Sequence, residues 1–214
     1  MIQACIFDLD GVIVDTAHYH FLAWRRLAAE LGFELTPEAN ERLKGVSRMR
    51  SLEIILEIGG LQRSREEMDA MATRKNAWFV EYIEAMQAHE IFPGITDLFA
   101  KIRQAGMKIG LASSSKNADT VLRKLGIAHH FDAIVDGTMI IHTKPDPEIF
   151  LLSASKLGVV PAQCVVFEDA QAGVEAAKRA GMRCVGIGKK EQLGAADIVV
   201  AQTGAFDFSA LLKF

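Results

Sequence analysis

The chain begins with an apolar run that two acids close, Gln3-Ala4-Cys5-Ile6-Phe7-Asp8-Leu9-Asp10-Gly11. The run predicts a short buried strand, and the acids with the glycine predict a loop directly after it. Five further apolar runs of this kind follow, at residues 108–112, 133–135, 164–167, 183–187 and 198–200. The sequence therefore indicates several buried strands spread along the chain.

Segments with helical periodicity separate these runs, and each stops at a glycine. They span residues 96–105, 117–125, 147–157 and 172–180, before Gly106, Gly126, Gly158 and Gly181. Glycine just past a helix supplies the left-handed residue that ends it. Strands that alternate with such helices predict an α/β fold, a Rossmann-like parallel sheet with helices on both faces.

One stretch, from about Thr16 to Glu90, contains helical patterns only. Phe21, Trp24 and Leu27 recur at helical spacing, and three later helices have start signals. The signals are Thr36 before Pro37, Ser47 before a helix over 48–58, and a capping box at Ser64–Glu67 before a helix toward Met86. We therefore expect residues 1–14 and 91–214 to form the α/β core and residues 15–90 to form an all-helical domain, a candidate lid.

Composition limits the class of protein. Of 214 residues, 50% are hydrophobic and 24% charged, and the net charge is −3, a balance that favours neither nucleic acid nor a membrane surface as a partner. No apolar run approaches ~18 residues, and the first residues lack a basic signal-peptide region. Three cysteines lie in apolar runs, as in a reducing compartment. We expect a soluble cytoplasmic protein.

Polar residues follow the apolar runs in an ordered way. Asp8 and Asp10 follow the first run and Glu168-Asp169 the fourth, while Lys144 lies in the segment after residues 133–135. Ligands of open α/β sheets bind outside the carboxyl ends of the strands, so these groups should meet at one edge. Carboxylates gathered without softer ligands favour Mg²⁺.

This set suggests phosphoryl chemistry. A carboxylate beside Mg²⁺ and Lys144 is a plausible nucleophile toward phosphorus, which we assign to Asp8, and Asp10 could act as general acid and base. Each acid alone could equally be a helix cap or turn residue, and Lys144 a solvated lysine. Their joint placement after separate strands favours the site.

These residues resemble the haloacid dehalogenase (HAD) superfamily. Asp8-Leu9-Asp10-Gly11-Val12, Ser113, Lys144-Pro145 and Glu168-Asp169 match its four signature motifs in order. The helical insertion after the first motif is similar to the superfamily's C1-type cap. The likeness covers essentially the whole chain.

Within the superfamily the chain resembles the β-phosphoglucomutase family. Besides the motifs, the resemblance rests on Asp15-Thr16-Ala17, Tyr19-His20-Phe21, Leu43 to Arg48, Arg74-Lys75-Asn76 and Glu168 to Gly173. It implies interconversion of β-glucose 1-phosphate and glucose 6-phosphate through a bisphosphate, with Asp8 phosphorylated. It also implies that Asp8, the Asp10 carbonyl, Glu168 and Asp169 bind Mg²⁺, and that Ser113 and Lys144 hold the phosphoryl group. The chain departs from the family at Val14, at Ser114 and in the apolar stretch 136–143.

A mutase must also bind a second phosphate, far from the metal. Arg48, with backbone N–H groups around Gly45 at the start of a helix, fits that role, although it could be a solvated first-turn residue. The resemblance extends the expected substrate-binding set to Asp10, His20, Trp24, Lys44, Gly45, Val46, Arg48, Ser51, Lys75, Ser113, Ser114, Ser115, Lys116, Asn117 and Lys144. Thr16 and His20, one helical turn apart, would couple lid closure to proton transfer.

Two rival functions share parts of this pattern. One is a HAD hydrolase that releases phosphate from a sugar phosphate or pyrophosphate with the same core residues. The other is a receiver-like module switched by aspartyl phosphorylation, which has no use for a helical lid or for Glu168-Asp169. We expect a monomer that acts on a small sugar phosphate.

Overall fold

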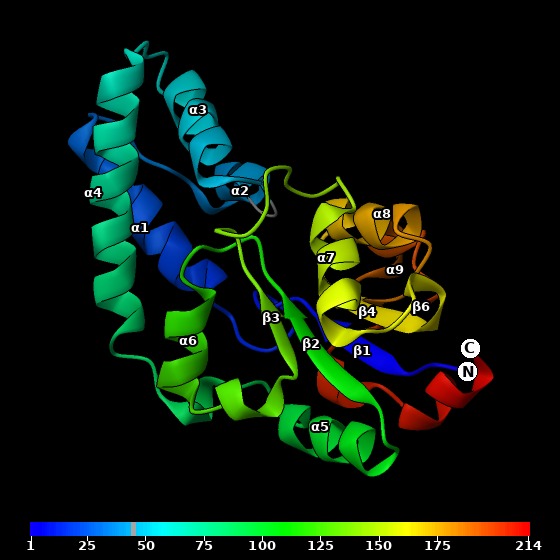
Figure 1. Ribbon diagram of the computed structural model, residues 1–214. Helices are drawn as coiled ribbons and strands as arrows, with labels where there is room; N and C mark the ends of the chain where they lie inside the picture. Colours follow the sequence, from blue (N-terminus) through cyan, green and yellow to red (C-terminus); the bar gives the residue numbers. More distant parts are fainter. Residues whose placement is uncertain (44–45) are drawn as a thin grey trace. The chain divides into compact units, whose positions relative to one another are not determined.

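The computed structural model describes residues 1–43 and 46–214, and the chain divides into two compact units (Figure 1). One unit contains Met1–Asp15 with Gln87–Phe214 and is called the core unit here; the other, Thr16–Met86, is called the helical unit. None of the helices among the described residues combines the length and the apolar character that crossing a membrane requires.

The core unit is built on one six-stranded sheet, and all its neighbouring strands pair in parallel. The strands are β1 (Ala4–Phe7), β2 (Lys108–Ala112), β3 (Ala133–Val135), β4 (Cys164–Glu168), β5 (Arg183–Ile187) and β6 (Ile198–Val200). Their order is β3-β2-β1-β4-β5-β6. The chain builds one half of the sheet outward from β1 and then returns to build the other half from β4, so the order reverses between these two strands. Ligands of such sheets bind at this switch point.

Helices cover both faces of this sheet, which confirms the predicted fold class. They are α5 (Ile95–Gln104), α6 (Ala118–Leu125), α7 (Glu148–Leu157), α8 (Gln171–Arg179) and α9 (Lys190–Leu193). The glycines after α6 and α7, Gly126 and Gly158, have φ of +71° and +64°. These are the left-handed helix ends that the sequence predicts.

Both faces of the central strands are buried, which explains their continuous apolar runs. Phe7 and Phe167 stack with ring centroids 4.4 Å apart, and Phe99 of α5 meets Phe7 edge-on at 5.1 Å. On the opposite face Ile6 and Phe150 belong to one buried cluster. Each such side chain contributes about 1.5–3 kcal/mol when fully buried. This packing fixes β1 beside β4.

The helical unit contains α1 (Ala17–Glu30), α2 (Pro37–Asn40), α3 (Arg48–Ile58) and α4 (Arg65–Ile83), with a short 3₁₀ turn, η1 (Glu41–Leu43). The predicted caps form: Ser47 accepts a hydrogen bond from the Arg50 N–H at 3.2 Å, and Ser64 with Glu67 makes the reciprocal box. Strands are absent from the described part of this unit.

The boundaries differ from the sequence-based expectation by a few residues. Helix α4 ends at Ile83 rather than continuing toward Met86, and residues 87–90 belong to the core unit. The residues that follow pair within the core unit: Phe92 donates a backbone hydrogen bond to Ile13 at 2.9 Å, and Ile91 bridges Val14. These bonds tie the returning chain to the loop after β1.

Candidate active site

Two buried acids lie side by side at the switch point. Asp8 follows β1 and Glu168 ends β4, and the Asp8 N–H donates to the Phe167 carbonyl at 3.0 Å. Their side chains are almost inaccessible, with residue exposures of 6% and 1%. Asp8, Glu168 and Asp169 each offer a carboxylate oxygen, and these oxygens lie within 4.8 Å of one another. The structure thus brings together acids 160 positions apart in the sequence.

Two glycines leave the space that these carboxylates occupy. Gly11 has φ +76°, and a Cβ there would overlap the Asp169 carboxylate. A Cβ at Gly173, in the first turn of α8, would overlap the carboxylate of Glu168. Larger residues at either position would displace an acid, so both glycines support the geometry of the cluster.

Lys144 provides the positive charge within this cluster. Its ammonium Nζ donates to Asp8 Oδ1 at 2.5 Å and to Glu168 Oε2 at 2.7 Å, and lies 5.0 Å from the Phe150 ring centroid. Burial alone would lower the pKa of Lys144, but the charges of Asp8 and Glu168 outweigh burial and raise it above its usual range. The lysine is therefore charged at neutral pH.

The carboxylates still carry more negative charge than one lysine offsets. Burial, reinforced by the charge of Asp8, raises the pKa of Glu168 and of Asp169. Such a shift means that the ionised forms need a further cation. Oxygen-only donors this close together suit a hard divalent ion, and Mg²⁺ fits them better than zinc or iron.

Asp10 lies in the tight loop between β1 and the helical unit. The loop is closed by a hydrogen bond from the Gly11 N–H to the Val14 carbonyl at 2.8 Å and by a bridge between Asp10 and Val14. Asp10 is partly exposed, unlike Asp8. Its charge also raises the pKa of Asp169, so it lies within electrostatic range of the cluster.

The loop after β2 carries the predicted hydroxyl run. Ser113 is 1% exposed, and its Oγ accepts from the Ser115 N–H at 3.2 Å, while Ser115 Oγ accepts from the Asn117 N–H at 3.2 Å. Lys116 is exposed. The Ser114 hydroxyl is buried and has no hydrogen-bond partner in the part of the chain that the structure describes.

In the helical unit, the predicted residues of α1 and α4 form a packed cluster. Lys75 Nζ lies 2.7 Å from His20 Nδ1, 4.4 Å from the Trp24 ring centroid and 5.0 Å from that of Phe79. His20 stacks on Phe79 at 3.9 Å. Burial, then the charges of Lys75 and Arg48, lower the pKa of His20 well below its usual value, so this imidazole is neutral.

The other predicted residues of the helical unit differ in accessibility. Lys75 and Trp24 are interior side chains, only 1% and 3% exposed. Thr16 and Ser51 are also buried, whereas Val46 and Arg48 are partly exposed. Burial lowers the pKa of Arg48. Lys44 and Gly45 lie outside the described residues.

Two side chains that contact these groups are not among the site residues expected from the sequence. Phe79, the ring under His20, lies one helical turn after Lys75 on α4, so the i,i+4 spacing could have indicated it. Phe150, near Lys144, appears in the sequence only as a core residue of α7. Its contact depends on how α7 packs on the sheet, which no local pattern records.

Comparison with known proteins places this fold and site in a class. The profile of the haloacid dehalogenase-like hydrolase family matches residues 2–181. The chain therefore belongs to this family.

Three individual relatives are similar over most of the chain. The β-phosphoglucomutase of Bacillus subtilis (strain 168) is 47% identical over 94% of this chain and 90% of its own length. A crystal structure of β-phosphoglucomutase from Clostridium difficile superposes with a TM-score of 0.95 at 46% identity, covering 100% of this chain and 96% of that one. A phosphorylated carbohydrates phosphatase of Thermotoga maritima is 36% identical over 84% of this chain and 82% of its own length.

Proposed function

We propose that the protein is a β-phosphoglucomutase, a phosphotransferase of the isomerase class. It interconverts β-D-glucose 1-phosphate and glucose 6-phosphate through an aspartyl-phosphate enzyme and a glucose 1,6-bisphosphate intermediate. The observation that carries this proposal is the 47% identity to the Bacillus enzyme over 94% of the chain. Free, buried thiols at Cys5, Cys164 and Cys184 suit a reducing compartment, so we assign the enzyme to the cytoplasm, and we propose that it acts as a monomer.

Asp8 is the proposed nucleophile. Its carboxylate attacks phosphorus of the bisphosphate, an Asp8 O–P bond forms, and the bond from phosphorus to the sugar oxygen breaks. Attack by one anion on another is opposed by their repulsion, which Lys144 reduces from its contacts with Asp8 and Glu168 at 2.5 and 2.7 Å. Ser113, buried at the end of β2, is the proposed second donor to the phosphoryl group.

The acid cluster suits Mg²⁺ as cofactor. The oxygens of Asp8, Glu168 and Asp169 lie within 4.8 Å of one another, and their burial calls for more positive charge than Lys144 provides. We propose these residues, with the backbone carbonyl of Asp10, as ligands. A bound Mg²⁺ would neutralise negative charge on the transferring phosphoryl oxygens.

Asp10 is the proposed general acid and base. A group in this role must give a proton to the departing sugar oxygen and take one from the incoming hydroxyl. Asp10 is partly exposed beside the buried Asp8, so it can exchange protons with a substrate. Ser114, Ser115, Lys116 and Asn117, in the loop between β2 and α6, are proposed to bind the sugar or its phosphate.

Residues of the helical unit are proposed to bind the second phosphate and to exclude water. Arg48, in the first turn of α3, offers a guanidinium fork beside Val46, and Lys44 and Gly45 belong to the same predicted loop. Lys75, Trp24 and Ser51 are buried, so we assign them to positioning His20 and Arg48. The backbone carbonyl of Thr16 accepts a hydrogen bond from the His20 N–H at 3.0 Å, which anchors the first turn of α1.

A coupled assay on β-glucose 1-phosphate tests the proposal, with the α anomer as control. We expect glucose 6-phosphate to form from the β anomer at the rate of substrate loss. The relative from Thermotoga, named as a phosphatase, supports one alternative, a sugar-phosphate phosphatase or pyrophosphatase. Release of free phosphate equal to substrate loss, without glucose 6-phosphate, would establish that alternative and exclude the mutase.

A further inference from the structure

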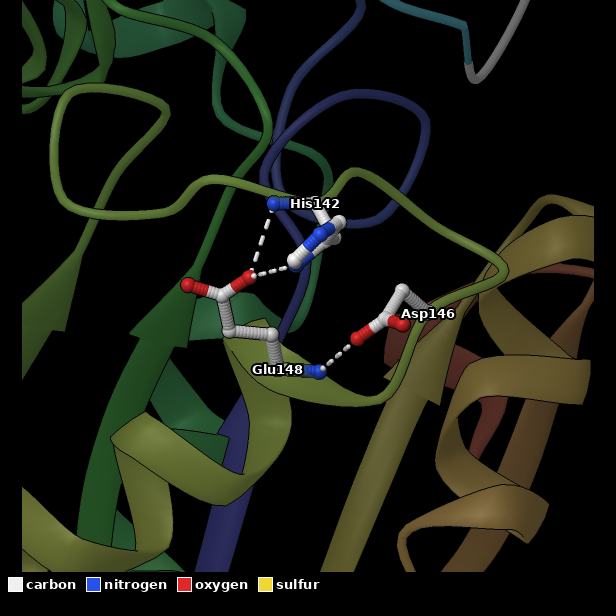
Figure 2. Close-up of side chains that lie close together, drawn as sticks. All are labelled: His142, Asp146 and Glu148. Carbon is white, nitrogen blue, oxygen red and sulfur yellow. Dashed lines mark hydrogen bonds and ion pairs between the residues drawn. The ribbon is translucent and has the colours of Figure 1, made fainter.

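Three metal-ligating side chains gather in the segment that leads from β3 into α7, apart from the acid cluster described above. They are His142, Asp146 and Glu148 (Figure 2). The proposed reaction uses none of them. Each offers one ligand atom, and these atoms lie within 4.8 Å of one another.

The spacing is suitable for a shared ion. His142 Nδ1 lies 3.0 Å from Glu148 Oε2. Two adjacent ligands of one ion, with bonds of about 2.0–2.2 Å, lie about 3 Å apart. In Figure 2 the Asp146 carboxylate accepts a hydrogen bond from the backbone N–H of Glu148, and one of its oxygens lies within 4.8 Å of the ligand atoms of His142 and Glu148. The ligand atoms would therefore need small adjustments rather than a rearrangement of the segment.

Backbone hydrogen bonds already orient both carboxylates. Glu148 accepts from the N–H groups of Ile141 and His142 at 3.0 and 2.7 Å, and Asp146 Oδ1 accepts from the Glu148 N–H at 2.9 Å. A carboxylate has about four acceptor positions, so each keeps lone pairs for an ion. The His142 side chain is 68% exposed, which leaves the site open to ions from solvent.

We propose that His142, Asp146 and Glu148 form a second metal site, selective for a transition-metal ion. An imidazole with two carboxylates and open positions suits Zn²⁺, Co²⁺, Ni²⁺ or Mn²⁺, whereas Mg²⁺ prefers oxygen ligands. The ion takes the place of the proton on His142 Nδ1 that faces Glu148. That proton leaves to solvent and Nε2 takes one up, so the bound ring is a neutral imidazole with its proton on Nε2. The two sites thus differ in donor set, and the second does not depend on the reaction proposed for Asp8.

The location gives this site a connection to the acid cluster. Lys144 lies between His142 and Asp146 in the sequence, and its ammonium contacts Asp8 and Glu168. An ion held by residues on both sides of Lys144 would restrict the backbone that carries this lysine.

The test measures Co²⁺ binding to the full chain in saturating Mg²⁺, by visible absorption and equilibrium dialysis. We expect one Co²⁺ per chain, with a dissociation constant raised about tenfold or more by His142→Ala and by Asp146→Asn. His142→Ala removes an exposed ring and keeps the backbone bonds to Glu148. His89→Ala, at another exposed histidine, is the matched control and should bind Co²⁺ like the wild type.

Asp169→Asn distinguishes the two clusters, because Co²⁺ binding should persist in it. The proposal is overturned if the wild type binds no Co²⁺ beside Mg²⁺, if His142→Ala binds as tightly as the wild type, or if Asp169→Asn loses the ion. These binding results are independent of whether the enzyme proves to be a mutase or a phosphatase.

Discussion

Two buried lysines, Lys144 in the core unit and Lys75 in the helical unit, are stabilised in different ways. Lys144 is 7% exposed and pairs with the carboxylates of Asp8 and Glu168. Lys75 is 1% exposed and contacts an imidazole nitrogen and two aromatic faces. An ammonium that leaves water needs compensation. For Lys144 this compensation comes from two carboxylates. For Lys75 the lone pair of His20 Nδ1 and the aromatic faces of Trp24 and Phe79 contribute to it.

The difference fits the proposed roles of the two regions. Asp8 and Glu168 together carry more negative charge than Lys144 neutralises, and a hard cation can neutralise the remainder. The described contacts of Lys75 instead require a neutral partner, because His20 Nδ1 can accept a hydrogen bond only without a proton. Nε2 then carries the proton of this imidazole. The contacts of Lys144 thus fit its proposed part in the reaction, and those of Lys75 fit its proposed part in orienting neighbouring groups.

The largest expected difference is in stability. Lys144→Met leaves Asp8 and Glu168 buried without their cation and should lower the free energy of unfolding by about 3–5 kcal/mol in Mg²⁺-free buffer. Lys75→Met keeps apolar contact with Trp24 and Phe79 and should cost about 1–2 kcal/mol, mainly from the hydrogen bond lost at His20. Urea unfolding of both variants measures this. Equal decreases in the free energy of unfolding would mean that the burial of the two ammonium groups is compensated to the same extent.

The second-largest expected difference between the two lysines is in the turnover number. We expect Lys144→Met to reduce kcat of the mutase reaction by about 10²–10³-fold, because Lys144 is proposed to offset charge in the transition state. Lys75→Met, the matched control at the other buried lysine, should reduce kcat by less than about tenfold. Initial rates on β-glucose 1-phosphate give the comparison, and a larger loss in Lys75→Met would reverse our assignment.

A third cation, the partly exposed Arg48, extends the comparison to substrate binding. Arg48→Ala should lower mutase kcat/KM by about 10–100-fold, the effect of losing charge-assisted hydrogen bonds to a phosphate. Hydrolysis of a small phosphate ester, which has no second phosphate, should change little. Arg50→Ala on the same helix is the control, because Arg50 is exposed and pairs with Glu53 at 2.9 Å. Equal loss of both activities in Arg48→Ala would contradict the assigned role.

The smallest expected effect is a pH dependence at His20. Its pKa in the folded protein is depressed below the usual 6.5 by burial and by Lys75 and Arg48. Below about pH 6.5 the unfolded chain therefore binds a proton that the folded chain does not, so stability falls as the pH falls. The loss is at most about 1.4 kcal/mol per pH unit.

Unfolding free energies of wild type and His20→Gln, measured from pH 5 to 8, isolate this contribution. The stability difference between them should narrow toward acid pH, where the wild type loses the contribution. His89→Gln, at an exposed position, should keep the wild-type slope. An unchanged slope in His20→Gln would show that His20 is not held neutral.

Much of the fold was predictable because local signals specify it. The six apolar runs became the six strands, and Ser47, Ser64 and Glu67 made the predicted caps. The meeting of Asp8 with Glu168 followed from the general position of sites in parallel sheets. The end of α4 at Ile83 was not predicted, because no glycine or proline stands between Ile83 and Pro93 to mark a stop.

The sequence by itself determined the elements, their order and the acids at the sheet edge, since strand runs, caps and glycine stops act over a few residues. Only the tertiary structure decided the partners: that Lys75 meets His20, 55 residues away, that Phe150 lies near Lys144, and that His142 joins Asp146 and Glu148. Burial and charge at these side chains depend on which helix packs on which neighbour. That packing arises from the whole fold, so no short stretch of sequence encodes it.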